Sequence, residues 1–406
     1  MEDTAAGTTS PARFEYDFDY LGSMGHALGA RDSRAASCRY PLSYEDHPER
    51  TWPAFLLDLM PSGAARRHWE TRYGLPNNAS SDWHVLVRGG GNPPGNLRVA
   101  EAVEPDPASP SHLGFAREEV VARAADFIEY ARASGAPVSG SSGAGGDSPK
   151  FLLREDLRGR WHADGALPDD RTRACWIVKF PRNRADPADR LILRAEAAYH
   201  RVAARFGART HGRVEWESDC LFVERFDRIV TGRTVERLGL ESLASLVGVA
   251  EFGVPIRKER LTAAIAQFVR DPAKELREFL LRDVLDVALG NTDNHGRNTS
   301  VLKHADGRVA LSPLYDFAPM FLDRSGIARV SRWADDSGLP DWAQAAESLS
   351  EHGLDAAETR RWLGGLADPV RELPTTMRDC DVPSEVVAES TNRIHRVGDA
   401  LARLSA

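Results

Sequence analysis

The sequence predicts an α+β fold of two lobes, with an additional α+β subdomain at the N-terminus and a helical C-terminal lobe. Three observations support this. Short apolar runs of strand length follow one another in the middle of the chain, helical patterning begins at Leu238, and a proline-rich stretch at residues 105–110 separates both from the N-terminal third. The expected domains are residues 1–104, 105–235 and 236–406.

The composition excludes several classes of protein. The 406 residues are 42% apolar and 28% charged, which is ordinary for a globular chain of two or three domains. No apolar run approaches the roughly 20 residues that cross a bilayer, and the N-terminus lacks a signal-peptide pattern, so we expect a cytoplasmic protein without membrane association. The four cysteines show no metal-ligand spacing and are expected to be reduced. The net charge is −8, whereas proteins that bind DNA by themselves usually carry a basic surface. Contact with DNA would therefore need a partner.

The N-terminal subdomain is expected to mix strands and helices. Residues 1–12 are small and polar, which predicts fraying. Residues 14–20 alternate aromatic and acidic side chains, and this period of two predicts a strand.

A run of glycine, serine and alanine at residues 139–148 precedes a strand-like segment at 151–153. Small residues let backbone amides approach phosphates closely and form an anion nest, here at Gly143, Ala144, Gly145 and Gly146. Flexible linkers have the same composition, so the run alone is weak evidence. The run lacks the Gly-Lys-Ser/Thr ending and the following helix of a Walker A loop, which argues against a P-loop NTPase.

Lys179 lies near the end of an apolar run at residues 175–181, which predicts a strand closed by proline. Alternation places Trp176, Val178 and Phe180 on one face and Lys179 on the other. A lysine on an apolar strand needs a partner for its ammonium. Two hypotheses explain Lys179 equally well when it is taken alone. It could be a strand lysine that reaches ATP phosphates, or a lysine that protects an edge strand from pairing. The catalytic loop downstream favours the first.

A helix is expected between Asp186, as N-cap before proline, and Gly207. Glu196 falls on its apolar face and is the candidate partner of Lys179. A solvated position or a local ion pair with Arg194 or Arg201 is the alternative.

Asp293 precedes Asn298 by five positions, and a second acid, Asp316, follows a strand-like run. This is the spacing of a protein-kinase catalytic loop and its metal-binding acid. One carboxylate takes the hydroxyl proton, and oxygen ligands hold Mg²⁺ against the phosphates. A polar turn explains one or two of these residues but not the whole set. The sequence therefore favours a protein-kinase-like fold, in which a helix lined by Leu276, Leu280, Val284 and Val287 ends at Gly290 and delivers the loop.

Several motifs together resemble the HipA family of serine/threonine kinases, the toxin halves of bacterial toxin–antitoxin pairs. In chain order, the similarity is carried by these segments: 55–63, with Ser62 where glutamate is usual, 94–99, the Gly/Ser-rich stretch 139–150, 176–181, 223–228, 290–298 and 312–316. The resemblance covers nearly the whole chain, and residues 291–298 are its most specific part.

The resemblance implies an ATP-dependent kinase that phosphorylates a protein hydroxyl. Asp293 would be the catalytic base, Asn298 and Asp316 the Mg²⁺ ligands and Lys179 a ligand of the ATP phosphates. Lys150 would brace the phosphate loop, His295 would orient the catalytic loop, and backbone groups from Glu224 to Phe226 would face the adenine unless this is an ordinary amphipathic strand. Family members bind a HipB-like antitoxin, which carries the operator-binding helix-turn-helix, and studied relatives act on aminoacyl-tRNA synthetases.

The phosphate loop departs from the family pattern at Asp147, because a carboxylate close to ATP phosphates would repel them. Family members also autophosphorylate a serine of this loop, for which Ser141 and Ser142 are candidates. Two alternatives remain open from the sequence. One is a small-molecule kinase with the same Asp–Asn spacing, and the other is a pseudokinase that only binds its antitoxin.

Overall fold

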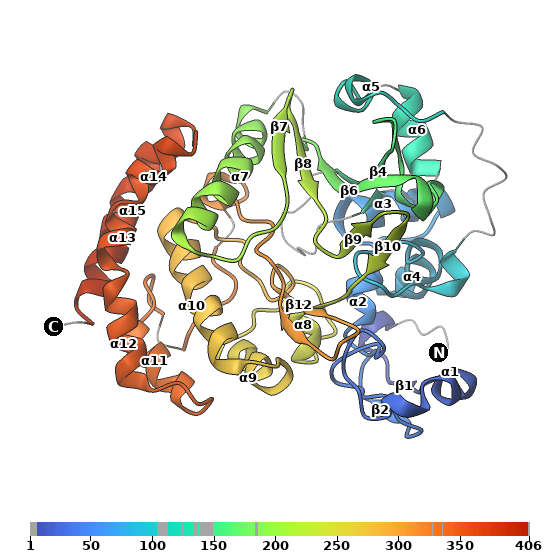
Figure 1. Cartoon of the computed structure of the whole chain (residues 1–406), viewed down its shortest axis with the longest axis horizontal. Coiled ribbons are helices and arrows are strands. Elements are labelled where there is room, and N and C mark those ends of the chain that lie inside the picture. Colours follow the sequence, from blue (N-terminus) through green and yellow to red (C-terminus); the bar gives the residue numbers. More distant parts are fainter. Residues whose placement is uncertain are drawn as a thin grey trace. The chain divides into compact units, whose positions relative to one another are not determined.

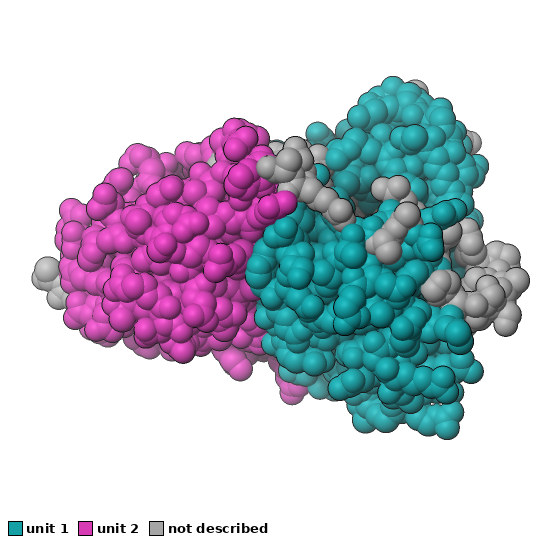
Figure 2. Space-filling model, turned by 90° about the horizontal axis from the view of Figure 1, so that it is seen from above, with its two compact units in different colours: residues 1–182, 212–254, 300–309 teal, residues 183–211, 255–299, 310–406 magenta. Residues whose placement is uncertain are grey.

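The computed structural model describes residues 6–103, 113–123, 125–133, 137–138, 149–182, 186–326, 328–334 and 336–404. Helices and strands are mixed throughout them, as the predicted α+β class requires (Figure 1). The chain divides into two compact units (Figure 2). Unit 1 contains residues 1–182, 212–254 and 300–309, and unit 2 contains residues 183–211, 255–299 and 310–406.

The N-terminal part of unit 1 is a small α+β layer. β1 (Ala12–Phe14) and β2 (His47–Glu49) pair antiparallel. The helices that follow are α1 (Phe18–Ser23), α2 (Leu56–Leu59), α3 (Gly63–Tyr73) and α4 (Asp82–Gly89). Their core is built around Trp52, Phe55, Leu57, Val85 and Leu86. Burial of these large apolar side chains stabilises the layer.

The strand predicted at residues 14–20 is wrong. β1 ends at Phe14, and Phe18 opens α1. Asp17 is the physical reason, since its carboxylate accepts a hydrogen bond from the Tyr20 N–H at 2.9 Å and caps the helix. The capping acid lies inside the alternating pattern and ends the strand early.

The central sheet of unit 1 is antiparallel, in the order β3-β4-β6-β8-β7 with β5 on β4. Its strands are β3 (Pro137–Val138), β4 (Lys150–Asp156), β5 (Trp161–Ala163), β6 (Thr172–Lys179), β7 (Val214–Glu217) and β8 (Cys220–Glu224). α5 (Arg117–Val121) and α6 (Ala125–Ala133) lie against it (Figure 1).

One face of this sheet is apolar, and the other, here called the charged face, carries buried basic side chains beside apolar ones such as Leu152 and Leu221. Alternate residues of β4, β6 and β8, with side chains of α5 and α6, form the apolar core: Phe151, Leu153, Trp176, Val178, Phe180, Phe222, Val120 and Phe127. The alternation predicted for residues 176–180 is confirmed. The opposite face of the same strands carries Lys150, Arg154 and Lys179, all of them buried.

The remaining elements of unit 1 form two strand pairs and a short helix. β9 (Arg228–Thr231) and β10 (Thr234–Arg237) make a hairpin, and β11 (Gly239–Ser242) pairs antiparallel with β12 (Ser300–Lys303). α8 (Leu243–Leu246) follows β11 directly.

Unit 2 is mainly helical. Its elements are α7 (Pro187–Phe206), α9 (Lys258–Phe268), α10 (Pro272–Leu289), α11 (Trp342–Ser350), α12 (Ala356–Gly365), α13 (Ala367–Arg371), α14 (Leu373–Asp379) and α15 (Ser384–Ala402); β13 (Val309–Leu311) lies at its boundary. α7 is the predicted helix: Asp186 accepts from the Ala188 N–H at 2.9 Å, and Gly207 ends it at φ 100°. Tyr199 of α7 donates to the Leu289 carbonyl at 3.0 Å and so fixes the end of α10.

Two predictions from composition can be compared with these elements. No helix in the described ranges has both the length and the apolarity needed to span a bilayer. The four cysteines are buried and form no disulfide: Cys38, Cys175, Cys220 and Cys380.

Candidate active site

The catalytic loop begins where α10 ends. Gly290 adopts φ 74° at the C-terminus of this helix. A Cβ at this position would lie 2.5 Å from Nη2 of Arg393 and 2.5 Å from Cδ1 of Phe321. Backbone conformation and space both require glycine here, and they fix the direction in which the loop leaves the helix.

Asp293 and Asn298 are held together inside the loop, and both are buried. The Asn298 side-chain amide donates to the Asp293 backbone carbonyl at 2.7 Å. The Asn298 backbone N–H donates to the His295 carbonyl at 2.9 Å. Because the first bond uses Nδ2, Oδ1 of Asn298 is directed away from it.

His295 lies beside the predicted base. Its Nε2 is 3.5 Å from Oδ1 of Asp293, and its Nδ1 accepts from the Arg297 backbone N–H at 3.2 Å. An accepting Nδ1 leaves the ring proton of neutral histidine on Nε2, which faces the carboxylate. The His295 ring therefore lies next to the Asp293 carboxylate.

Asp316 has a left-handed backbone, with φ 51°. Aspartate tolerates this region better than most residues, and such conformations recur at functional sites. The preceding residue fixes the segment, because the Tyr315 hydroxyl donates to the Arg297 carbonyl at 2.9 Å. Asp316 thus follows directly on a residue bonded to the catalytic loop.

The donor chemistry of this loop suits Mg²⁺. Asn298 offers an amide oxygen and Asp316 a carboxylate, both hard oxygen ligands. In the part of the chain that the structure describes, no group of three or more His, Cys, Asp or Glu side chains could form a metal cage. Mg²⁺ is commonly held by one or two carboxylates together with substrate phosphates, and this pair of residues fits that arrangement.

The charged face of the central sheet carries two lysines directly opposite each other. Lys150 of β4 pairs with Lys179 of β6, which places their Cβ atoms about 5 Å apart. Like charges at such positions destabilise a strand pair, and an anion lying against both would offset that cost. The pair lies at the end of β4 that follows residues 139–148. Two cationic side chains therefore face each other at the start of β4 and the end of β6.

Lysine is rare in this chain, which makes these positions informative. Of 52 Lys and Arg residues only five are lysines. Four of these are buried: Lys150, Lys179, Lys258 and Lys303. An ammonium is a compact point charge that a guanidinium does not replace, so a chain that otherwise uses arginine keeps lysine where that geometry is needed.

The other predicted site residues are distributed as follows. Gly143, Ala144, Gly145, Gly146, Ser141 and Ser142 lie outside the described residues. Glu196 is buried on α7 in unit 2, whereas Lys179 belongs to unit 1, so their pairing stays a prediction. Glu224 ends β8 and accepts from Nε of Arg213 at 3.2 Å. The strand expected to run to Phe226 ends two residues earlier, and Phe226 is half-buried.

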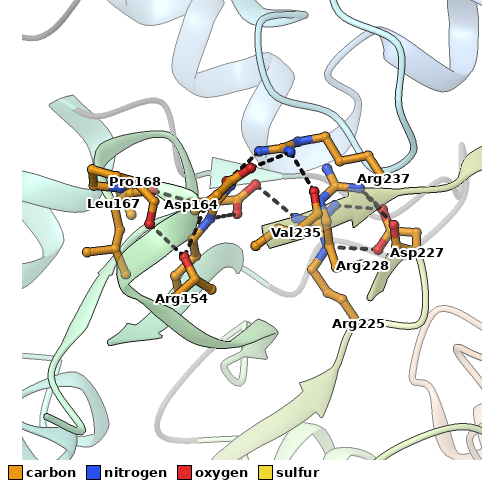
Figure 3. A network of polar contacts seen from close by, with 12 residues as sticks. Arg154, Asp164, Leu167, Pro168, Arg225, Asp227, Arg228, Val235 and Arg237 are labelled. Atoms are coloured by element: carbon orange, nitrogen blue, oxygen red, sulfur yellow. Dashed lines mark hydrogen bonds and ion pairs between the residues drawn. The ribbon is translucent and has the colours of Figure 1, made fainter. Parts of the chain in front are cut away.

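The segment after β8 is fixed by a buried network of arginines and aspartates (Figure 3). Asp227 accepts from Nη2 of Arg225 at 2.7 Å, from Nη1 of Arg228 at 2.7 Å and from the Gly95 N–H at 2.7 Å. Arg225 continues to Asp164 at 3.1 Å. In the sequence only residues 223–228 carried a signal, as one of the HipA-like motifs, and the pairing of this segment with Asp164 and Gly95 could not be foreseen because these residues are distant in sequence.

A second part of the network surrounds β4 (Figure 3). Arg154 donates to Asp164 at 2.5 Å and to Asp169 at 2.7 Å, and Arg237 donates to Asp169 at 2.8 Å. Burial raises the pKa of Asp227, but the guanidinium groups of Arg225 and Arg228 outweigh it and lower the pKa to about 2. The carboxylates therefore remain ionised, and the network holds the residues beyond β8 in one conformation.

Comparison with known proteins identifies the family. A model of the HipA-like C-terminal domain matches residues 142–372, and a model of the HipA N-terminal domain matches residues 1–100. The chain belongs to the HipA family. The resemblance stated from its motifs is thus confirmed. No curated protein matches the chain in sequence.

A solved HipA structure has the same fold. HipA of Shewanella oneidensis MR-1, in its toxin–antitoxin complex with HipB and operator DNA, matches with a TM-score of 0.60 at 17% identity and covers 88% of each chain. At this identity the likeness establishes the fold. The Helicobacter pylori proinflammatory kinase CtkA matches with a TM-score of 0.37 at 12% identity, over 65% of this chain and 91% of that chain.

Two HipA-family motifs of the N-terminal third serve as anchors within unit 1. Asp58 accepts from the Ser242 N–H at 2.9 Å and from the Ser245 hydroxyl at 2.7 Å, and so holds the start of α8. Gly95 at φ 88° contributes its N–H to Asp227, and a Cβ there would lie 3.2 Å from Leu240. Both motifs contact segments far away in sequence.

Proposed function

We propose that this HipA-family chain is an ATP-dependent serine/threonine protein kinase and the toxin of a toxin–antitoxin pair. The observation that carries the proposal is the pairing of Asp293 with Asn298 in a buried loop, with the His295 ring next to the carboxylate. This supplies a fixed base and an oxygen ligand at the spacing that phosphoryl transfer requires.

In this mechanism Asp293 takes the proton of the attacking hydroxyl as the oxygen forms its bond to the γ-phosphorus, the bond from that phosphorus to the β,γ-bridging oxygen breaks, and ADP leaves. Asn298 and Asp316 would hold Mg²⁺, which would neutralise charge on the phosphates. Lys179 and Lys150 bind the phosphates from the charged face of β4 and β6. Backbone groups from Glu224 to Phe226 receive the adenine, in the segment fixed by the Asp227 network.

The partners follow from charge and family. A chain with 60 acidic and 52 basic residues is a poor ligand for a DNA phosphate backbone. We therefore assign DNA contact to a HipB-like antitoxin, as in the complex of the Shewanella oneidensis relative. The substrate is a protein hydroxyl, with aminoacyl-tRNA synthetases as the class to examine first, and the chain works in the cytoplasm.

The test is intact-protein and peptide mass spectrometry after incubation with ATP and Mg²⁺. We expect one phosphate on Ser141 or Ser142, because these serines lie in the segment proposed to hold the γ-phosphate. Asp293→Asn should slow phosphate incorporation by about 10²–10⁴-fold while its melting temperature stays near that of the wild type.

Three results would contradict parts of this proposal. Incorporation by Asp293→Asn at the wild-type rate would exclude Asp293 as the base. An unmodified 139–150 peptide from an enzyme that phosphorylates protein would exclude self-modification of this loop. Absence of both transfer and ATP binding would leave the pseudokinase reading instead.

A further inference from the structure

The catalytic loop is clamped on both sides of Asp293. On one side, the Asn291 side chain donates from Nδ2 to Oδ1 of Asp286 at 2.8 Å, and its backbone N–H donates to the Asp286 carbonyl at 2.9 Å. On the other side, Asn294 and Ser331 exchange two hydrogen bonds of 3.3 Å each. Asp293 lies between these two anchors.

Both anchors lead to the same charged cluster beneath the loop. Next to Ser331, the Arg332 carbonyl accepts from the Lys258 backbone N–H at 3.0 Å. The Trp333 indole N–H donates to Oδ2 of Asp283 at 2.7 Å, and the Lys258 ammonium forms an ion pair with the same carboxylate. Asp283 and Asp286 are three residues apart on α10 and therefore lie on one side of this helix. The cluster links α9, α10 and the segment at 331–333 to the start of the loop.

Lys258 is an unusual residue for its position. It is buried at the first turn of α9, where the positive end of the helix dipole disfavours a cation. Two neighbouring carboxylates on α10 supply the opposite charge that such an ammonium needs. It is also one of the four buried lysines of a chain that otherwise uses arginine. The cluster therefore has a specific geometry rather than a generic surface pair.

We propose that Asp286 is a positioning residue of the phosphotransfer site, which fixes the catalytic loop through Asn291 and interacts electrostatically with the ammonium of Lys258, the partner of Asp283. The inference rests on the proposed kinase function for its effect on rate. Its effect on the loop itself does not depend on that function.

The charge state of Asp286 should then control the loop. Burial raises its pKa, against the lowering effect of Lys258, the Asn291 hydrogen bond, Arg329 and Arg282. The other charged groups of the cluster are Asp283, Glu259 and Asp336, the last paired with Arg329. As the pH falls below neutrality, Asp286 becomes protonated before an ordinary aspartate, and the Asn291 amide loses a charged acceptor.

The sign of the linkage separates this local effect from global unfolding. A carboxyl group whose pKa is raised in the folded state contributes stability that is complete below its unfolded pKa and is lost as the pH rises through the folded value. Protonation of Asp286 therefore does not destabilise the whole fold. The rate should fall toward acid pH while the melting temperature does not fall through this group.

The first measurement is amide hydrogen exchange of residues 290–298 in the full chain. Asp286→Ala should accelerate exchange in this peptide, and Asn291→Ala, which removes the same bond from the loop side, should do likewise. Asp286→Asn keeps an acceptor oxygen but loses the charge, and should accelerate exchange less than Asp286→Ala does. Glu358→Gln, an exposed carboxylate of α12 paired with Arg277, is the matched control and should change nothing. Unchanged exchange in Asp286→Ala and Asn291→Ala would overturn the inference.

The second measurement is the pH profile of phosphate transfer. Asp286→Ala should lower kcat by about 10- to 100-fold, the scale of a lost hydrogen bond to a charged group, with little change in KM for ATP. Asp286→Asn should keep much of kcat and lose the part of the acid limb that Asp286 contributes. An acid limb identical to the wild type in Asp286→Asn would refute control by its charge. If the wild type transferred no phosphate, the proposed function would fail, and the exchange result would still decide whether Asp286 positions the loop.

Discussion

Lysine marks special positions in this protein because arginine occupies almost every other basic position. Lys303 shows one such use: its ammonium donates to the Ala35 and Ala36 carbonyls at 2.9 and 3.0 Å and lies 3.4 Å from Glu241. Three separate acceptors around one point suit the ammonium group of lysine, which has three donors, rather than the planar guanidinium group of arginine. Lys150 and Lys179 differ from Lys303 in facing each other, which is the arrangement expected of an anion site.

Replacing Lys179 by Met tests that arrangement at the scale of one residue. The substitution keeps most of the side-chain volume and removes one of two facing charges. ATP should raise the melting temperature of the wild type only when Mg²⁺ or Mn²⁺ is present, because ligand binding to the folded state stabilises it by mass action. Lys179→Met should lose most of this shift. A thermal scan at millimolar ATP measures both effects.

The control for this experiment is Lys274→Met. Lys274 is exposed on the first turn of α10 and belongs to no predicted site. The Lys274→Met variant should keep the full rise in melting temperature with ATP and Mg²⁺. An equal loss in both variants, or a shift that persists without a divalent cation, would contradict the assignment of Lys179 and of the metal ligands.

At the scale of secondary-structure elements, the buried arginine–aspartate network joins β4, the end of β8 and the β9–β10 hairpin. Breaking a buried ion pair by removing one partner leaves the other charge uncompensated, at a cost of about 3–5 kcal/mol. Asp227 is the centre of one half, since Arg225, Arg228 and the Gly95 N–H all donate to it. Asp227→Asn should therefore lower the free energy of unfolding at neutral pH, measured by urea denaturation.

The same carboxylates predict how stability depends on pH. The pKa of Asp227 and that of Asp169 are both lowered to about 2. For Asp227, burial raises the pKa, but the charges of Arg225 and Arg228 lower it by more. For Asp169, the hydrogen bond from Arg237 is the largest cause. A depressed pKa contributes stability above the unfolded value of about 3.9 that is lost as the pH falls toward 2; for buried Asp227 this is of order 2–3 kcal/mol. The Asp227→Asn variant should show a shallower acid decline. Glu236→Gln, exposed on β10, should decline as the wild type does, and a wild type whose stability is flat from pH 4 to 2 would refute the role of the network.

Elements bounded by local signals could be predicted from the sequence. α7 and the end of α10 were located correctly because Asp186, Gly207 and Gly290 act within one turn of the helix they delimit. The strand at 14–20 failed because Asp17, read there as part of an alternation, caps a helix. Contacts between distant segments could not be predicted. The bond of Asn291 to Asp286 and the use of Gly95 by Asp227 depend on the tertiary fold, although the rarity of lysine could have singled out Lys258.

For the whole molecule, the sequence predicts most directly that the chain binds DNA weakly, because its net charge is negative. Acidic residues outnumber basic ones by 60 to 52. Non-specific binding to duplex DNA depends on neutralising phosphates with Lys and Arg, and many of the basic side chains of this chain are already committed to carboxylates. The chain alone should therefore have little affinity for DNA.

Fluorescence anisotropy with a labelled duplex of about 20 base pairs measures this property. The chain alone should show no saturable binding below roughly 100 μM at physiological salt, the weak end of ordinary non-specific affinities. A small basic DNA-binding domain on the same duplex is the positive control, and its affinity should fall steeply as salt rises. A salt-sensitive complex of the chain alone in the low micromolar range would show that it carries its own DNA surface. In that case a HipB-like antitoxin would not be required for DNA contact, and the proposed division of labour between toxin and partner would be wrong.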